Sequence, residues 1–382
     1  MTPSSQQKLY NMKTIIKILV LAIGLTTQLY GQDFPDDFYN AEKKIIKSEV
    51  LNLEKLLFIY LPNNYYKDTT KSYPVHYLTD APTTSNIYFD LLRLHSLANT
   101  VPQSIVVGLS SDNRNYNLYP EKGAEKYLQF IKSEVIPYID KNYRTNLFKV
   151  IAGHSLGGDF VIYTMIKEPS LFNAYIAGSP GPIETIIRLL DTTEYKLNST
   201  DYKFFYSSIG SDDFTDTVAF DQFREKLKAE VSKKVDCNFD INKGENHISN
   251  IVINYQKGIT KLYSDWQFIL PDNLNKPISE ELKSHYDKLE NKFGYRPEIG
   301  EWDVIFPIMD ILAKRGDFKN AIDILKYCIE IHPMSDQAYA FLAKAHFDAG
   351  QMELGMKYLK KSLELNPENP FALRMKMMIE NK

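Results

Sequence analysis

Hydrophobic positions in the middle of the chain follow two different periods. Residues 148–152 form a short, largely β-branched and apolar run that suits a buried strand, and residues 158–167 continue as an apolar stretch with helical spacing. Residues 202–209 form another run that suits a strand, and it ends at Gly210. The pattern therefore predicts a strand, a sharp turn and a helix in succession, with a further strand downstream.

From about residue 302 onward the chain repeats itself at a separation of 34 residues. This period is typical of the tetratricopeptide repeat, whose unit is a pair of antiparallel helices. The small residues of the repeat let the helices approach closely, and the prolines end the second helix of each unit. The matching pairs are Gly316 and Gly350, Ala321 and Gly355, Leu325 and Leu359, Ile329 and Leu363, Ile331 and Leu365, and Pro333 and Pro367.

Two repeats of this kind bury too little surface to be stable alone. We expect them to pack against a bridging helix near residues 279–293, against a carboxy-terminal helix around residues 370–380, or against the preceding domain. Repeats of this class also allow a protein partner or self-association, but the sequence identifies no partner.

The amino-terminal segment has the pattern of a signal peptide. Residues 12–17 are positively charged, residues 18–26 are apolar, and Gly31 offers a small residue at a cleavage point. Met12 is an alternative start, because the residues before it are polar. The apolar run is short for a bilayer span, which disfavours an uncleaved anchor, and no cysteine follows it for lipid attachment. We therefore expect export to the periplasm or the extracellular space.

Composition adds few constraints. The 382 residues allow two domains, 44% hydrophobic residues suffice for real cores, and a net charge of −3 gives no reason to expect nucleic acid as a partner. The sequence lacks His-Glu-x-x-His, paired Cys-x-x-Cys and phosphate-loop motifs, so no metal or nucleotide cofactor is implied. Cys237 and Cys328 fall in different predicted domains and are expected to be free thiols.

The most specific motif is Gly153-His154-Ser155-Leu156-Gly157, which has the Gly-x-Ser-x-Gly form of a nucleophile elbow. In such an elbow the serine lies on a sharp turn between a strand and a helix, and glycine removes the Cβ atoms that would collide there. The predicted strand and helix flank the motif on the correct sides. We therefore favour a nucleophilic Ser155 over an ordinary glycine-rich turn.

A serine hydroxyl needs a base to take its proton and an acid to orient that base. His247 is the one histidine downstream of Ser155 and outside the helical carboxy-terminal region, where packing or surface roles are expected for His285, His332 and His346. The acid should follow the strand that ends at Gly210, because the carboxyl ends of strands present catalytic groups. Asp212 and Asp213 both stand there, and a solvated turn is the alternative role for either.

With these residues the chain resembles the putative esterase family. This family includes enterochelin (siderophore) esterases, S-formylglutathione hydrolases, feruloyl and acetylxylan esterases and antigen 85 acyltransferases. The resemblance covers residues from about 45 to 265. It implies an α/β-hydrolase fold, a mostly parallel sheet flanked by helices, and it points to Asp213 as the acid, three residues after Gly210. Besides the elbow, the matching segments are residues 58–62, 73–80, 105–108, 114, 119–120, 135–145 and 179–180.

The elbow and the resemblance together also suggest an oxyanion hole. One donor is the backbone N–H of Leu156, directly after the nucleophile, and the other comes from the loop after an earlier strand. Ala81 is the predicted second donor, because Pro82 has no N–H. Relatives commonly have glycine in place of Ala81 and aromatic residues in place of Gly181-Pro182, so we expect a substrate pocket that differs from those of siderophore esterases.

These observations predict four segments: a signal peptide over 1–31, an esterase domain over 32–268, a linker with a bridging helix over 269–300, and repeats over 301–382. The predicted function is exported hydrolysis of a small-molecule carboxylic ester through an acyl-enzyme. An acyltransferase that uses the same triad and a non-catalytic scaffold that acts through its repeats are the alternatives. The identity of the ester stays open.

Overall fold

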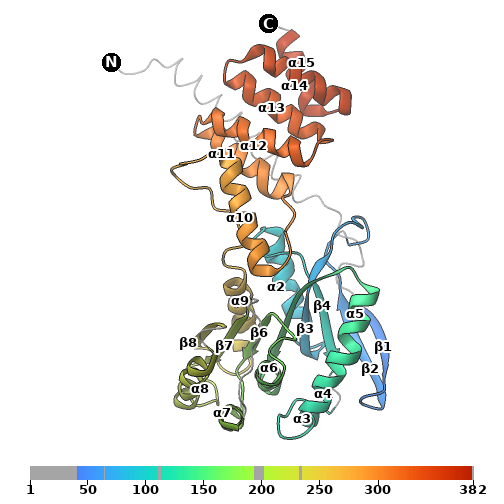
Figure 1. Ribbon diagram of the computed structural model, residues 1–382, viewed down its shortest axis with the longest axis vertical. Helices are drawn as coiled ribbons and strands as arrows, with labels where there is room; N and C mark the ends of the chain where they lie inside the picture. Colours follow the sequence, from blue (N-terminus) through green and yellow to red (C-terminus); the bar gives the residue numbers. More distant parts are fainter. Residues whose placement is uncertain (1–40, 64, 111–112, 193–201, 232–234, 381–382) are drawn as a thin grey trace, which may run out of the picture. The chain divides into compact units, whose positions relative to one another are not determined.

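The computed structural model describes residues 41–63, 65–110, 113–192, 202–231 and 235–380, and these residues form an eight-stranded sheet with the order β1-β2-β4-β3-β5-β6-β7-β8 (Figure 1). β2 runs antiparallel to β1 and to β4, and every other neighbouring pair is parallel. The predicted mostly parallel sheet is therefore confirmed. The strands are β1 (Glu42–Ser48), β2 (Leu53–Tyr60), β3 (Tyr73–Ala81), β4 (Ile105–Ser110), β5 (Thr145–His154), β6 (Ala174–Gly178), β7 (Phe204–Gly210) and β8 (Asp236–Asn242).

Helices cover both faces of this sheet (Figure 1). On one face, Tyr88 of α2 and Tyr255 of α9 pack edge to face with ring centroids 5.1 Å apart. On the other face, Tyr127 of α4 and Phe160 of α6 pack in the same way at 5.4 Å. Because both faces are covered, the central strands are apolar on both sides. The helices are α2 (Ser85–Leu97), α3 (Arg114–Asn117), α4 (Ala124–Phe130), the π-helical turn η2 (Ile131–Val135), α5 (Ile136–Asn142), α6 (Leu156–Lys167), α7 (Ile183–Thr192), α8 (Thr217–Val231) and α9 (Asn250–Leu262).

The parallel register brings the carboxyl ends of four strands to one edge of the sheet. His154 of β5 lies opposite Gly178 of β6, which in turn lies opposite Ser208 of β7. Gly210 at the end of β7 lies opposite Asn242 at the end of β8. The loops that leave this edge carry all three predicted catalytic side chains, as the rule for open α/β sheets requires.

The carboxy-terminal region is helical and keeps the predicted period. Gly316 and Gly350 have φ angles of 75° and 74°, and each ends the first helix of its pair in the left-handed conformation that favours glycine. A Cβ on Gly355 would overlap the ring of Phe347, so this position needs glycine for the close approach of two helices. The elements are α10 (Ile278–Phe293), the π-helical turn η3 (Glu301–Ile305), α11 (Phe306–Lys314), α12 (Phe318–Ile331), α13 (Asp336–Asp348), α14 (Met352–Leu365) and α15 (Pro370–Glu380).

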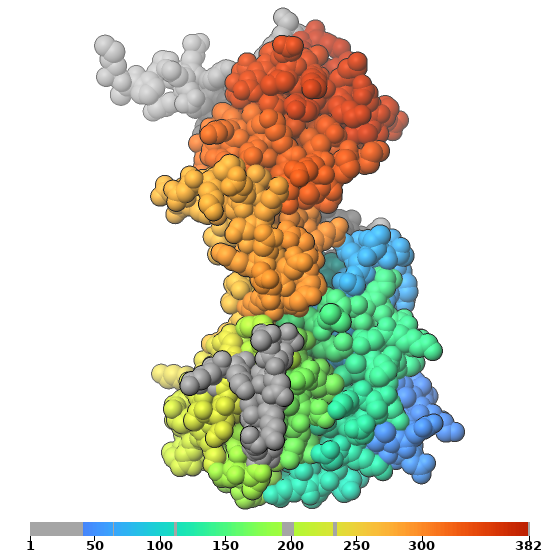
Figure 2. All heavy atoms as spheres, in the orientation of Figure 1, coloured from blue at the N-terminus to red at the C-terminus, as the bar shows by residue number. Residues whose placement is uncertain are grey.

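Neighbouring helices complete the core of the repeats. Ile278, Leu282 and Tyr286 of α10 belong to the same buried cluster as the apolar side chains of α11, α12 and α13. Ala372 of α15 packs in a second cluster with residues of α13 and α14. In the space-filling view the atoms of α11 to α15 pack against one another as one mass (Figure 2). Both the bridging helix and the carboxy-terminal helix thus support the repeats.

The far end of α10 packs on the hydrolase-like part of the chain. The ring of Phe293 lies 5.1 Å from Phe148, 5.4 Å from Tyr263 and 5.7 Å from Trp266, measured between centroids. Phe148 is near the amino end of β5, so this contact lies at the opposite end of the strand from Ser155.

Phe293→Ala is expected to lower the free energy of unfolding by about 3–5 kcal/mol, because it leaves a cavity among three aromatic rings. Denaturant unfolding of the full chain measures this change. Met334→Ala is the control, because the side chain of Met334 is 75% exposed, and it should stay within about 0.5 kcal/mol of wild type. Equal effects of the two substitutions would contradict the structural role of Phe293.

Candidate active site

Ser155 occupies the sharp turn between β5 and α6. Its φ and ψ angles are 59° and −127°, a conformation that is rare for any residue with a side chain. The surrounding glycines make the turn possible, because a Cβ on Gly153 would overlap the carbonyl of Gly157 and a Cβ on Gly157 would overlap the hydroxyl of Thr79. The Ser155 N–H donates to the carbonyl oxygen of Gly178 at 2.9 Å, which fixes the turn to the neighbouring strand.

His247 and Asp213 form a hydrogen bond at the same edge of the sheet. The distance from Nδ1 of His247 to Oδ1 of Asp213 is 2.9 Å, and the Asp213 side chain is fully buried. Asp212 is exposed, and its carboxylate accepts a hydrogen bond from the adjacent Ser211 hydroxyl. The structure thus brings Asp213, and not Asp212, to the histidine.

The surroundings of Asp213 keep its carboxyl ionised. Burial by itself would raise the pKa of Asp213, but hydrogen bonds from the Ser179 hydroxyl, the Thr215 N–H and His247 outweigh burial and lower the pKa below its usual value. Ser179 Oγ lies 2.6 Å from Oδ2, and the Thr215 nitrogen lies 3.2 Å from Oδ1. Both carboxylate oxygens therefore have donors.

The His247 ring lies between two other rings. Its centroid is 4.6 Å from that of His154, and it is 4.0 Å from that of Phe214, whose side chain is 75% exposed. Burial first, and then the charge of His247, lower the pKa of His154 to about 3, so His154 is neutral at physiological pH. His154 therefore adds no positive charge beside His247.

Ser155 and His247 line the same cleft, which has a volume of about 650 Å³. Ala81, one predicted oxyanion donor, also lines it, and Leu156, the other, follows Ser155 at the start of α6. One part of the lining is apolar and comes from β2 and α9. The complete lining is Leu56, Phe58, Asp80, Ala81, Pro82, Thr83, Thr84, Ser110, Arg114, His154, Ser155, His247, Ile248 and Ile251.

Arg114 is a charged residue of this cleft to which the sequence analysis assigned no role. Its Nε donates to Oδ1 of Asp80 at 2.7 Å, and its Nη2 donates to the carbonyl oxygen of His154 at 3.2 Å. These two bonds hold the guanidinium beside the elbow. No local spacing links Arg114 to Ser155 in the sequence, so only the fold reveals this placement.

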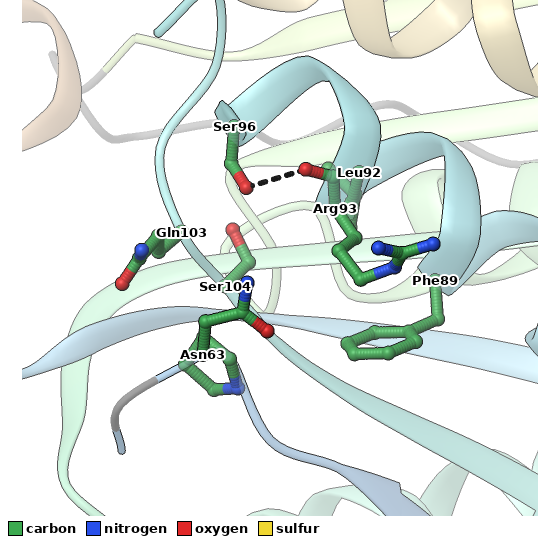
Figure 3. A pocket seen from close by; sticks show the side chains of 8 residues that line it. Asn63, Phe89, Leu92, Arg93, Ser96, Gln103 and Ser104 are labelled. Atoms are coloured by element: carbon green, nitrogen blue, oxygen red, sulfur yellow. Dashed lines mark hydrogen bonds between the residues drawn. The ribbon is translucent and has the colours of Figure 1, made fainter. Parts of the chain in front are cut away.

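A second cavity, of about 10 Å³, lies between α2 and the segments around residues 62–63 and 103–104 (Figure 3). Phe89 and Arg93 line it, and the Ser96 hydroxyl beside it donates to the carbonyl oxygen of Arg93 at 2.8 Å. A volume of this size holds about one water molecule. It cannot accommodate a substrate.

The other three histidines downstream of Ser155 are held by hydrogen bonds. His285 and His332 bond to backbone carbonyl oxygens through Nε2, at 3.1 and 2.8 Å, and Nδ1 of His346 lies 2.5 Å from Oε1 of Gln351. Cys237 and Cys328 are free thiols, as predicted. Within the described residues, no group of three or more His, Cys, Asp or Glu could hold a metal ion, and no helix is long and apolar enough to cross a bilayer. The predicted signal peptide lies outside the described residues.

Two segments of the sequence match known protein families. Residues 48–199 match the putative esterase family, and residues 312–376 match the tetratricopeptide repeat. The esterase match includes Ser155 and ends before Asp213 and His247. A ferri-bacillibactin esterase, BesA of Bacillus subtilis, is 27% identical over 37% of this chain and 58% of its own length. A siderophore enterobactin esterase of Emericella nidulans is 36% identical over 15% of this chain and 20% of its own. The chain thus spans less than two thirds of the length of these relatives.

Solved structures share the fold. An IroE-like serine hydrolase from Shewanella oneidensis superposes with a TM-score of 0.62 at 20% identity, over 75% of this chain and 98% of that one. An uncharacterised protein from Capnocytophaga ochracea superposes with a TM-score of 0.64 at 17% identity, over 85% and 93% of the two chains. The predicted α/β-hydrolase fold is confirmed, and the chain contains a segment that matches the putative esterase family, followed by a segment that matches the tetratricopeptide repeat.

Proposed function

We propose that this protein is an exported serine hydrolase that cleaves carboxylic esters of small molecules through an acyl-enzyme. One observation carries the proposal: His247 donates from Nδ1 to the buried Asp213 carboxylate while it lines one cleft with Ser155, which stands on a nucleophile elbow. The esterase family and the names of the curated relatives support the reaction class.

The chemistry follows from these contacts. Because Nδ1 of His247 is bonded to Asp213, Nε2 is the nitrogen that accepts the Ser155 proton as Oγ attacks the ester carbonyl. The backbone N–H groups of Leu156 and Ala81 stabilise the tetrahedral oxyanion. His247 returns the proton to the leaving alkoxide, and the alcohol departs. A water molecule then attacks the acyl-enzyme by the same route and releases the acid and free Ser155.

The lining of the cleft limits the substrate class. Leu56, Phe58 and Ile251 provide an apolar part of the lining for a hydrocarbon or aromatic part of the ester, and Arg114, which is bonded to Asp80, is a cationic side chain of the same cleft. Two of the curated relatives are named as siderophore esterases, so siderophore esters belong in the first substrate panel with acylated sugars, feruloyl esters and peptidic esters. Purified protein from residue 32 onward, incubated with this panel and analysed by product mass, tests the proposal.

A fluorophosphonate probe is expected to label the wild-type protein at Ser155, because the probe reacts with an activated serine. Ser155→Ala should be neither labelled nor active, and intact mass with peptide mapping measures the label. Labelling that persists in Ser155→Ala would contradict the serine mechanism. Recovery of an acylated alcohol when glycerol or a sugar is supplied would instead identify the enzyme as an acyltransferase.

Asp213→Asn is expected to lower kcat by up to about 10⁴, because the imidazole then loses its orienting carboxylate and takes the wrong tautomer. Asp212→Asn is the matched control, since it changes the adjacent carboxyl in the same way, and it should stay within about tenfold of wild type. Steady-state hydrolysis of a nitrophenyl ester measures both. The reverse ranking would assign the acid to Asp212, and no loss in either variant would indicate a dyad of Ser155 and His247.

Export is the part of the proposal that rests on the amino-terminal sequence. Expression of the full chain in a bacterial host should yield a mature protein in the periplasm or the medium, cut near Gly31. Cell fractionation with amino-terminal sequencing measures this. A full-length protein found only in the cytoplasm would contradict it.

A further inference from the structure

A chain of hydrogen bonds runs from the candidate triad acid to the protein surface. The Ser179 hydroxyl donates to Oδ2 of Asp213 at 2.6 Å and accepts from Nδ2 of Asn250 at 2.9 Å. Oδ1 of Asn250 accepts from Nδ2 of Asn242 at 2.6 Å, and Oδ1 of Asn242 accepts from the Lys257 ammonium at 2.6 Å. Three side chains thus connect a surface cation, Lys257, to the buried carboxylate of Asp213.

All donors in this chain point toward the carboxylate. The Lys257 ammonium can only donate, so the oxygen of the Asn242 amide must face it and the nitrogen must face Asn250. The Ser208 carbonyl oxygen can only accept, and it lies 3.2 Å from Nδ2 of Asn250. This contact independently determines which end of the Asn250 amide is the nitrogen. The Ser179 hydroxyl accepts from that amide and therefore gives its one proton to Asp213.

The middle of this hydrogen-bond chain is buried. Ser179 and Asn250 are fully buried, and Asn242 is 4% exposed. In such a medium each hydrogen bond is stronger than in water, and bonds that share one direction polarise one another. Lys257 lies at the surface end on α9, where its ammonium is also 3.6 Å from a carboxylate oxygen of Asp240.

The backbone of Ser179 provides a second, independent observation. Its φ angle is 41°, in the left-handed region where glycine or asparagine costs less. A serine at this position is explained by its hydroxyl, which bonds to both Asp213 and Asn250. Residues held in such conformations cluster at functional sites.

We propose that Ser179, Asn250, Asn242 and Lys257 are positioning residues for Asp213. They fix the carboxylate with Oδ1 toward His247 and withdraw negative charge from Oδ2, which tunes how strongly Asp213 stabilises protonated His247. This proposal rests on the proposed function, because it assigns Asp213 to orient the catalytic base.

The test is the pKa of His247, measured by NMR titration of histidine-labelled protein with no substrate present. The signal is assigned through His247→Gln among the seven histidines. The titratable and charged groups that face His247 are Asp213 after β7 and His154 at the end of β5, with Arg114 of α3 beside His154. Asp213 keeps the Thr215 N–H and His247 on Oδ1 when Ser179 is changed, so its carboxylate stays in place but regains charge.

Ser179→Ala and Ser179→Gly should therefore both raise the pKa of His247 and lower kcat/KM about tenfold at neutral pH, with little change in KM. The glycine variant also relieves the backbone strain, so a shared effect is due to the hydroxyl. An unchanged or lowered pKa of His247 in both folded variants would overturn the proposal.

Lys257→Met tests the surface end of the chain, where a substitution does not disturb the core. Its matched control is Lys261→Met, because Lys261 lies one turn further on α9 and also pairs with Asp240, at 3.5 Å, without a hydrogen bond to Asn242. Lys257→Met should raise the pKa of His247 in the same direction as the Ser179 variants, and Lys261→Met should leave it unchanged. Equal shifts of the His247 pKa in the two lysine variants would indicate a through-space charge effect and would contradict a role for the hydrogen-bond chain.

This readout separates the two proposals. If the wild-type protein hydrolyses no ester and takes no probe at Ser155, the proposed function is refuted. The NMR titration would still decide whether the hydrogen-bond chain acts on Asp213 and His247. If the wild type hydrolyses an ester and the pKa of His247 is unchanged in the Ser179 variants, only the proposal that the hydrogen-bond chain positions Asp213 would be refuted.

Discussion

The parallel hydrogen-bond ladder that joins β5, β6, β7 and β8 is the constraint on which the candidate site depends. The strands are in register at their carboxyl ends, so His154, Gly178 and Ser208 lie side by side. The loops that follow therefore begin side by side at one edge of the sheet. Asp213 and His247, which are far apart in sequence, meet there within hydrogen-bond distance. A slip of one residue in any of these strands would turn every side chain to the other face and separate Ser155 from His247.

This register places a carboxylate where water cannot solvate it. Burial of Asp213 favours its neutral form, which has no negative charge to stabilise a protonated imidazole, and hydrogen bonds from Ser179, Thr215 and His247 reverse that preference. The cost of desolvation is thus offset by hydrogen bonds from Ser179 after β6, from Thr215 within the same loop, and from His247 after β8. The ionisation of Asp213 therefore depends on groups from several strand ends, and no single sequence motif contains all of them.

Local chemistry explains what could be predicted from the sequence. Ser155 was identifiable because an elbow needs glycines at fixed offsets, and the strand and helix that flank it have distinct hydrophobic periods. His247 followed by elimination, since the other downstream histidines lie in the repeats or the bridging helix. Asp213 could not be separated from Asp212 by the residues themselves, because both stand in the same turn, and the resemblance to a family was needed.

The roles that sequence analysis missed have no local signal. Arg114 and Asn250 carry no spacing that relates them to Ser155, and they reach the site only through β4 to α3 and β8 to α9 connections. Ser179 stood within a recognised segment, yet its role depends on a φ angle of 41° and on the register of β6 with β7. Such partners become visible only when the sheet has been assembled.

The repeats obey a separate constraint, which explains why their pattern was readable without reference to the site. Their period is set by the close approach of paired helices, as at Gly355, and their core is completed by α10 and α15. The bridging helix meets the sheet through Phe293 near the amino end of β5, whereas Ser155 follows the carboxyl end of the same strand. β5 therefore contacts both parts of the fold: Phe148 near its amino end packs against Phe293 of the bridging helix, and its last residue, His154, leads into the turn that presents Ser155.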